Sequence, residues 1–105
     1  MKCVQLCREI AEKHHEYDLT NQLKRSSTSI SANLNEAAYA ASRADFSNKL
    51  NIAMKEANES RYWLDLFHET KMMDDRQYEE IYPSIESIIR MLTASLVTLR
   101  GKNSE

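Results

Sequence analysis

The sequence predicts an all-α fold, an antiparallel up-down bundle of four helices. One observation is the scarcity of turn-forming residues: the 105 residues include one Gly and one Pro, which leaves little room for the tight turns of a β fold. A second is a seam in the stretch 45–67, where small and apolar residues recur at alternating steps of four and three, the period of a packed helix. The members of this seam are Phe46, Leu50, Ala53, Ala57, Ser60, Leu64 and Phe67.

A third observation is a second line of residues beside this seam, with the same steps. Its members are Ile52, Glu56, Glu59, Trp63 and Leu66. A lone amphipathic helix needs only one covered face, so two lines indicate a helix that is covered on two flanks. We therefore expect one domain over residues 1–105, with helices at about 2–16, 19–40, 45–70 and 75–100.

The first two helices are expected to be joined by a short connection. Apolar residues at helical spacing, from Val4 to Tyr17, predict a first helix from Lys2 to Glu16, the shortest of the four. Asp18 offers a side-chain acceptor for free backbone N–H groups, so we place the start of the second helix directly after it. The seam of the second helix is thin in its middle, where five small residues let a neighbouring backbone approach: Ser26, Ser27, Ser29, Ser31 and Ala32.

The last two helices carry recognisable start signals. Either Ser42 or Asp45 can cap the third helix, and Asp74 with Gln77 three residues later forms the pattern of a capping box for the fourth. Pro83 removes one intrahelical hydrogen bond, so we expect either a kink near residues 79–83 or a restart at Ser84. Gly101 is the expected stop of the fourth helix, and residues 102–105 are expected to fray.

Composition limits the classes of function. A net charge of −2 gives no general attraction to nucleic acid, so such binding would need a local patch. The chain has no apolar run of the roughly 20 residues that a membrane span requires, and residues 1–10 lack the apolar block of a signal peptide. We therefore expect a cytoplasmic protein with no membrane contact. Cys3 and Cys7 lack a second pair of ligands and are interpreted as reduced, half-buried thiols.

A polar layer is expected between the second and third helices. If their connection centres on Arg43, residues equally distant from Arg43 on either side lie opposite each other, which sets the small serines against residues 56–60. Buried carboxylates need donors, so serine hydroxyls, with Arg25 and Arg61 nearby, are expected to satisfy the two glutamates. The layer comprises Ser26, Ser29, Asn33, Glu56 and Glu59. The alternative is a ligand or metal site in the same layer.

The hypothesis of an enzyme can be tested by searching the sequence for the best-known reactive site of helical bundles, the carboxylate-bridged di-iron site. That site requires two Glu-x-x-His turns and two further glutamates. Glu12 with His15 fits one such turn, whereas Asp65 with His68 is a weak second. Both pairs lie near helix ends, so this remains a minor alternative. The sequence contains no Ser-His-Asp, phosphate-binding or zinc-finger pattern. We expect no enzymatic activity, no cofactor and no metal.

Five stretches of the chain carry a resemblance to a known family: 19–27, 29–37, 42–53, 55–59 and 62–64. These stretches resemble the four-helix-bundle proteins related to the protein encoded in intervening sequences of 23S ribosomal RNA genes. The resemblance covers about half of the chain, in order and at the right separations. It implies a left-handed four-helix bundle that self-associates, with rings of five subunits among relatives, and a family without an established enzymatic activity. A more distant branch is the accessory protein of diversity-generating retroelements, which partners a reverse transcriptase and its RNA.

Two surfaces are candidates for function. The first is the line on the third helix, where Trp63, Tyr62, Leu66 and Ile52 need cover and favour a homo-oligomer, a pentamer by resemblance. The second is a basic rim at one end of the bundle, formed by Arg43, Lys49, Arg90, Arg100 and Lys102. We expect an oligomeric adaptor that binds an unidentified protein partner. Proteins that act on nucleic acid are among the candidate partners. Direct binding of structured RNA or DNA through the basic rim is the alternative.

Overall fold

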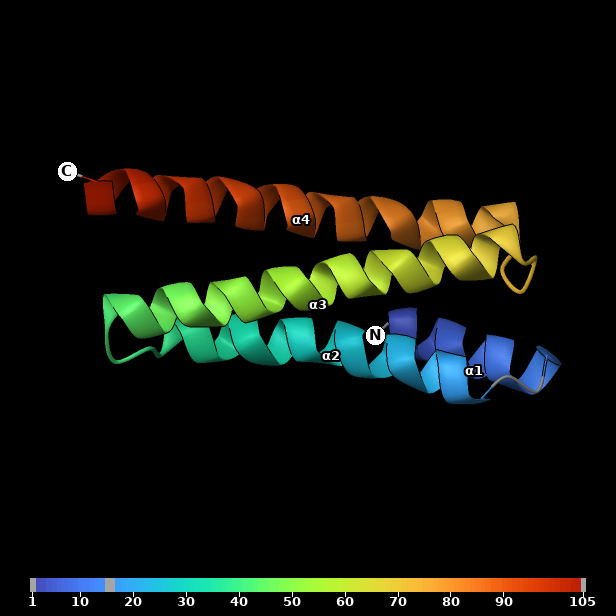
Figure 1. Ribbon diagram of the computed structural model, residues 1–105. Coiled ribbons are helices and arrows are strands. Elements are labelled where there is room, and N and C mark those ends of the chain that lie inside the picture. Colours follow the sequence, from blue (N-terminus) through green and yellow to red (C-terminus); the bar gives the residue numbers. More distant parts are fainter. Residues whose placement is uncertain (1, 15–16, 105) are drawn as a thin grey trace.

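The computed structural model describes residues 2–14 and 17–104 and, within them, contains four α-helices and no strand. The helices are α1 (Lys2–His14), α2 (Tyr17–Ala38), α3 (Arg43–Glu69) and α4 (Asp75–Ser104). They form an elongated bundle of 51 × 21 × 17 Å in which α2, α3 and α4 alternate in direction (Figure 1). No helix of the described part of the chain is long and apolar enough to cross a membrane.

The short α1 covers only part of the bundle. It has 13 residues, whereas α4 has 30, and it lies beside the first half of α2 (Figure 1). The main interfaces are those of α3 with α2 and with α4; α1 packs on α2 and contacts α4 only lightly. At the end of the bundle that holds the turn between α2 and α3, three helices therefore pack without a fourth.

The seam predicted in residues 45–67 is the buried face of α3. Leu50, Ala53, Ala57, Leu64 and Phe67 are buried in the core, and Phe46 is half-buried near the start of the helix. They meet apolar side chains from the other three helices. The larger of these are Leu6, Ile10, Leu23, Ile30, Ile81, Ile85, Leu92 and Leu96.

The two predicted start signals are confirmed. The backbone N–H of Asp45 donates to Ser42 Oγ at 3.0 Å, which makes Ser42 the N-cap of α3. At the start of α4 the backbone N–H of Gln77 donates to Asp74 Oδ1 at 2.8 Å. In return, the backbone N–H of Asp74 donates to Gln77 Oε1 at 3.0 Å, which completes the capping box.

Two predicted helix ends are wrong, and one of the two alternatives at Pro83 is excluded. Helix α2 begins at Tyr17, so Asp18 lies within its first turn, where its negative charge faces the positive end of the helix dipole. Helix α4 continues through Pro83, which is exposed, so the restart at Ser84 does not occur. It also passes Gly101, which does not adopt the left-handed conformation of a stop, and ends at Ser104. The expected extension of the first helix to Glu16 lies outside the described residues.

Candidate functional site

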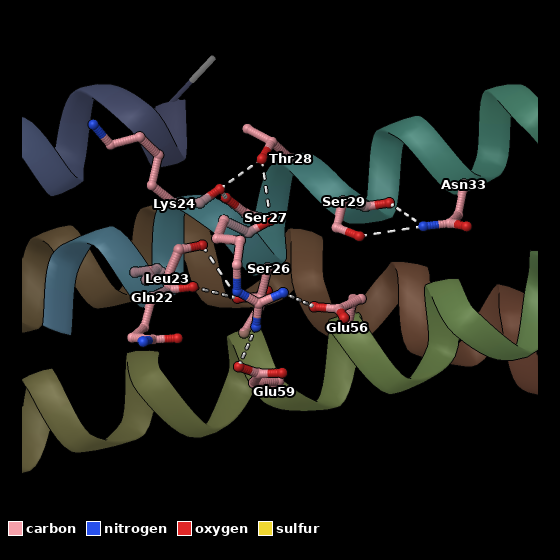
Figure 2. A network of polar contacts seen from close by, with 12 residues as sticks. Gln22, Leu23, Lys24, Ser26, Ser27, Thr28, Ser29, Asn33, Glu56 and Glu59 are labelled. Carbon is pink, nitrogen blue, oxygen red and sulfur yellow. Dashed lines mark hydrogen bonds and ion pairs between the residues drawn. The ribbon is translucent and has the colours of Figure 1, made fainter. Parts of the chain in front are cut away.

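A charged cluster joins the middle of α2 to the middle of α3. Arg25 Nη1 donates to Glu56 Oε2 at 3.3 Å, and Arg25 Nη2 donates to Glu59 Oε1 at 2.6 Å. Glu56 is 8% exposed, whereas the side chain of Arg25 is 53% exposed, so the guanidinium covers a carboxylate that lies deeper than itself. Figure 2 shows both glutamates pointing from α3 toward α2. One arginine thus satisfies two carboxylates.

The serine hydroxyls do not hold these carboxylates, which corrects the expected polar layer. Ser26 Oγ donates to the carbonyls of Gln22 and Leu23 of its own helix, as a short hydroxyl side chain in a helix readily does (Figure 2). Ser60 Oγ then donates to Ser26 Oγ at 3.0 Å, and both residues are fully buried. Ser26 and Ser60 are equally distant from Arg43, so the predicted register between the two helices is confirmed.

The other expected members of the layer bond within their own helices. Asn33 Nδ2 donates to the backbone carbonyl of Ser29 at 2.9 Å and to its Oγ at 3.2 Å (Figure 2). Arg61 donates to Asn58 of α3 rather than to a glutamate. The expected layer is therefore three separate groups: the buried Ser26–Ser60 contact, the Ser29–Asn33 pair, and the cluster of Arg25 with Glu56 and Glu59.

The Arg25 cluster divides an otherwise apolar face, which we name the α3 flank and define by Ile52, Glu56, Glu59, Trp63 and Leu66. Trp63 packs against the core, but its buried Nε1–H has no hydrogen-bond partner among the described residues. Ile52 and Leu66 are half-buried and lie outside the core cluster of the described residues. Tyr62, 59% exposed, borders this flank and meets the Trp63 ring edge-on at 5.1 Å between centroids. The flank presents apolar area that this chain leaves partly uncovered.

The basic rim is more dispersed than expected. Arg43 lines a cavity of about 570 Å³ between the first turns of α3 and Leu99 of α4. Arg90 is exposed and lies about 13 Å before Leu99 along α4, at a rise of about 1.5 Å per residue. Lys49 Nζ lies 2.8 Å from Glu36 Oε2, and this ion pair offsets its charge. Arg100 and Lys102 lie in the last turns of α4.

A cluster of aromatic and charged side chains between the end of α3 and the start of α4 was not predicted as a unit. His68 stacks on Tyr78 with ring centroids 4.0 Å apart, and Tyr78 stacks on Tyr82 at 4.6 Å. Tyr78 Oη donates to Asp65 Oδ1 at 2.8 Å, and His68 Nε2 lies 2.7 Å from Asp75 Oδ1. Burial, together with the hydrogen bond to the Asp65 carboxylate, raises the pKa of Tyr78. The helical spacing of Tyr78 and Tyr82 was the sequence pattern that could have indicated this stack.

The residues considered for a metal site do not converge. Asp65 and His68, the weak second pair, are bonded to Tyr78 and Asp75 respectively, while Glu12 is exposed and His15 lies outside the described residues. Within residues 2–14 and 17–104, no three His, Cys, Asp or Glu side chains lie close enough to hold a metal ion together. Cys3 and Cys7 are free thiols and are buried rather than half-buried.

Comparison with known proteins agrees with this architecture. A family model described as "23S rRNA-intervening sequence protein" matches residues 1–94. A crystal structure of a protein of unknown function from the S23 ribosomal protein family of Bacteroides thetaiotaomicron is similar, with 44% identity and a TM-score of 0.86. The similarity covers 90% of this chain and 87% of that chain. No curated protein matches the chain. The chain therefore belongs to the family of 23S rRNA-intervening sequence proteins.

Proposed function

We propose that this protein is a non-enzymatic scaffold or adaptor that self-associates and binds a protein partner that handles nucleic acid. Its left-handed bundle forms a ring of five copies, as the resemblance implies. The α3 flank is the self-association surface, and the observation that carries this assignment is the apolar surface of Ile52, Leu66 and the neighbouring Tyr62 that this chain leaves partly uncovered. Covering this apolar surface with a second copy would stabilise the assembly by about 25 cal/mol for each Å² removed from water.

The composition of the α3 flank supports the same assignment. Ile52 and Leu66 lie half-buried at its two ends, and the exposed ring of Tyr62 borders it. Interface centres are depleted in charge and enriched in aromatic residues. The charged pair in the middle of the flank, Glu56 with Glu59, is already bonded to Arg25 and does not enter an interface unpaired.

Light scattering of a matched pair of variants tests self-association. Leu66→Asp places a carboxylate on the α3 flank, whereas Asn58→Asp adds the same charge on the exposed face of α3. We expect wild type and Asn58→Asp to share a mass well above the 12.2 kDa of one chain, and Leu66→Asp to approach 12.2 kDa at micromolar concentration. A wild-type mass near that of one chain, or an unchanged mass for Leu66→Asp, would contradict the proposal.

Direct binding of structured RNA or DNA is the second candidate, and the cavity beside Arg43 favours it. The cavity joins Arg43 to hydroxyl and amide side chains of α3, namely Ser47, Asn48 and Asn51. Arginine, serine and asparagine side chains are common donors to phosphate oxygens. If five copies lie parallel in a ring, each adds Arg43 to one rim, which gives a local positive field on a chain of net charge −2.

Salt dependence separates the two candidates. We expect Arg43→Glu to weaken binding of a structured RNA and to lower the slope of log K against log salt by about 0.7–0.9 for each phosphate that the variant no longer neutralises. Arg76→Glu, at the opposite end of the bundle, is the matched control and should leave the slope unchanged. Equal slopes in both variants would exclude the basic rim. A partner captured from cell extract that survives both nuclease and high salt would instead favour the protein partner.

A further inference from the structure

Two buried thiols lie one above the other on α1. Cys3 and Cys7 are four residues apart, the spacing that brings side chains on one helix face into contact. Helix α1 presses this face against α2, and Ser27 of α2 lies beside Cys3. Neither thiol contributes to the α3 flank or to the basic rim.

Cys3 also lines a cavity of about 230 Å³, which we name the Cys3 cavity. It lies where the first turn of α1 meets α2 and α4. Its apolar wall consists of four isoleucines: Ile30, Ile81, Ile85 and Ile88. Exposed Ser31 and Ser84 mark its mouth, so solutes can reach Cys3 although the residue is only 9% exposed.

The two thiols have different acidities. A hydrogen bond from Cys7, opposed by burial and assisted by Ser27, lowers the pKa of Cys3 to about 7. The same contact, together with burial, raises the pKa of Cys7. The thiolate is the nucleophilic form of cysteine, so Cys3 is the reactive member and Cys7 remains a protonated neighbour.

We propose that Cys3 is a covalent-modification site that captures apolar electrophiles, specifically alkenes conjugated to a carbonyl group, and that the Cys3 cavity binds their apolar portion. The Cys3 sulfur attacks the β-carbon, forming a C–S bond, while the π electrons of the alkene shift to give an enolate. A water molecule at the mouth of the cavity donates a proton to the α-carbon, and the hydroxide that remains combines with the proton that Cys3 released. The addition needs no oxidant and expels no leaving group.

Two maleimides, which are conjugated alkenes of this class, test the proposal on the reduced full-length chain. N-cyclohexylmaleimide carries an apolar ring, whereas 3-maleimidopropionate carries a carboxylate that is costly to place in an isoleucine-lined cavity. Intact mass and peptide mapping give the rate at each cysteine, normalised to 2-mercaptoethanol with the same reagent. We expect Cys3 to react at least about tenfold faster with the apolar reagent, equivalent to about 1.4 kcal/mol.

Three variants assign this preference to the cavity and to the thiol pair. Ser84→Glu, at the mouth of the cavity, should abolish the preference, whereas Ser87→Glu, on the same helix outside the cavity, should retain it. In wild type the rate should fall as the pH drops below about 7, because the thiolate is lost. Cys7→Ala should move this fall toward about 8.5, the value of an ordinary thiol. Equal normalised rates for the two reagents, equal effects of the two glutamate variants, or labelling of Cys7 instead of Cys3 would overturn the proposal.

Discussion

Phe67→Ala is expected to lower the free energy of unfolding by about 3–5 kcal/mol, which is a large part of the stability of a domain of this size. Phe67 has no exposed surface and lies near the end of α3, where all four helices pack. The truncation removes an aromatic ring, and the closely packed surroundings cannot collapse fully into the space. Denaturant titration, monitored by circular dichroism, measures the loss.

Phe46→Ala is the matched control, because Phe46 is the other phenylalanine and belongs to the same seam of α3. It is half-buried at the end of the bundle where three helices pack, so its truncation should cost clearly less than that of Phe67. Equal losses for the two variants would show that the difference in packing between the ends is not reflected in stability.

Trp63→Ala is expected to have the second largest effect and to act on both folding and assembly. Trp63 packs against the core but is partly exposed, so we expect a loss of about 3 kcal/mol, the lower end of the range for a buried aromatic residue. If the α3 flank is an interface, the mass measured by light scattering should also fall. An unchanged unfolding curve together with an unchanged mass would contradict both roles.

Two neighbouring substitutions separate the two roles of Trp63. Tyr62 is 59% exposed in the single chain, so Tyr62→Ala should change the stability of that chain by no more than about 0.5 kcal/mol and still weaken the assembly. Trp63→Phe keeps a large ring and removes the N–H that has no acceptor. Because this N–H is buried within the chain and out of reach of a second copy, Trp63→Phe should leave the mass of the assembly unchanged and retain most of the stability of the chain.

The helices and their register could be predicted from sequence because each rests on a repeated pattern. The seam from Phe46 to Phe67 has many members, so a single exception cannot hide it. The short connection centred on Arg43 then sets the pairing of α2 with α3, and the Ser26–Ser60 contact agrees with it. A single residue carries less information, which is why the helix ends predicted from Asp18 and Gly101 were wrong.

The partners within the polar layer could not be predicted because several donors lay within the same two helical turns. Serine hydroxyls reach the carbonyl groups of their own helix first, whereas the longer side chain of Arg25 extends across to Glu56 and Glu59. The aromatic stack of His68, Tyr78 and Tyr82 depends on how α3 meets α4, which no spacing within either helix reveals. Contacts between elements were thus less predictable than the elements.

The short α1 gives the bundle two ends of unequal local stability. Where α1 is present, opening the structure exposes apolar surface from all four helices, whereas at the other end it exposes the surface of three. Local unfolding should therefore begin at the end of lower contact density, and backbone amides there should exchange with solvent sooner. The last turns of α4 and the first turns of α3 belong to that end, so the cavity beside Arg43 lies where a binding partner can reshape the chain at the smallest energetic cost.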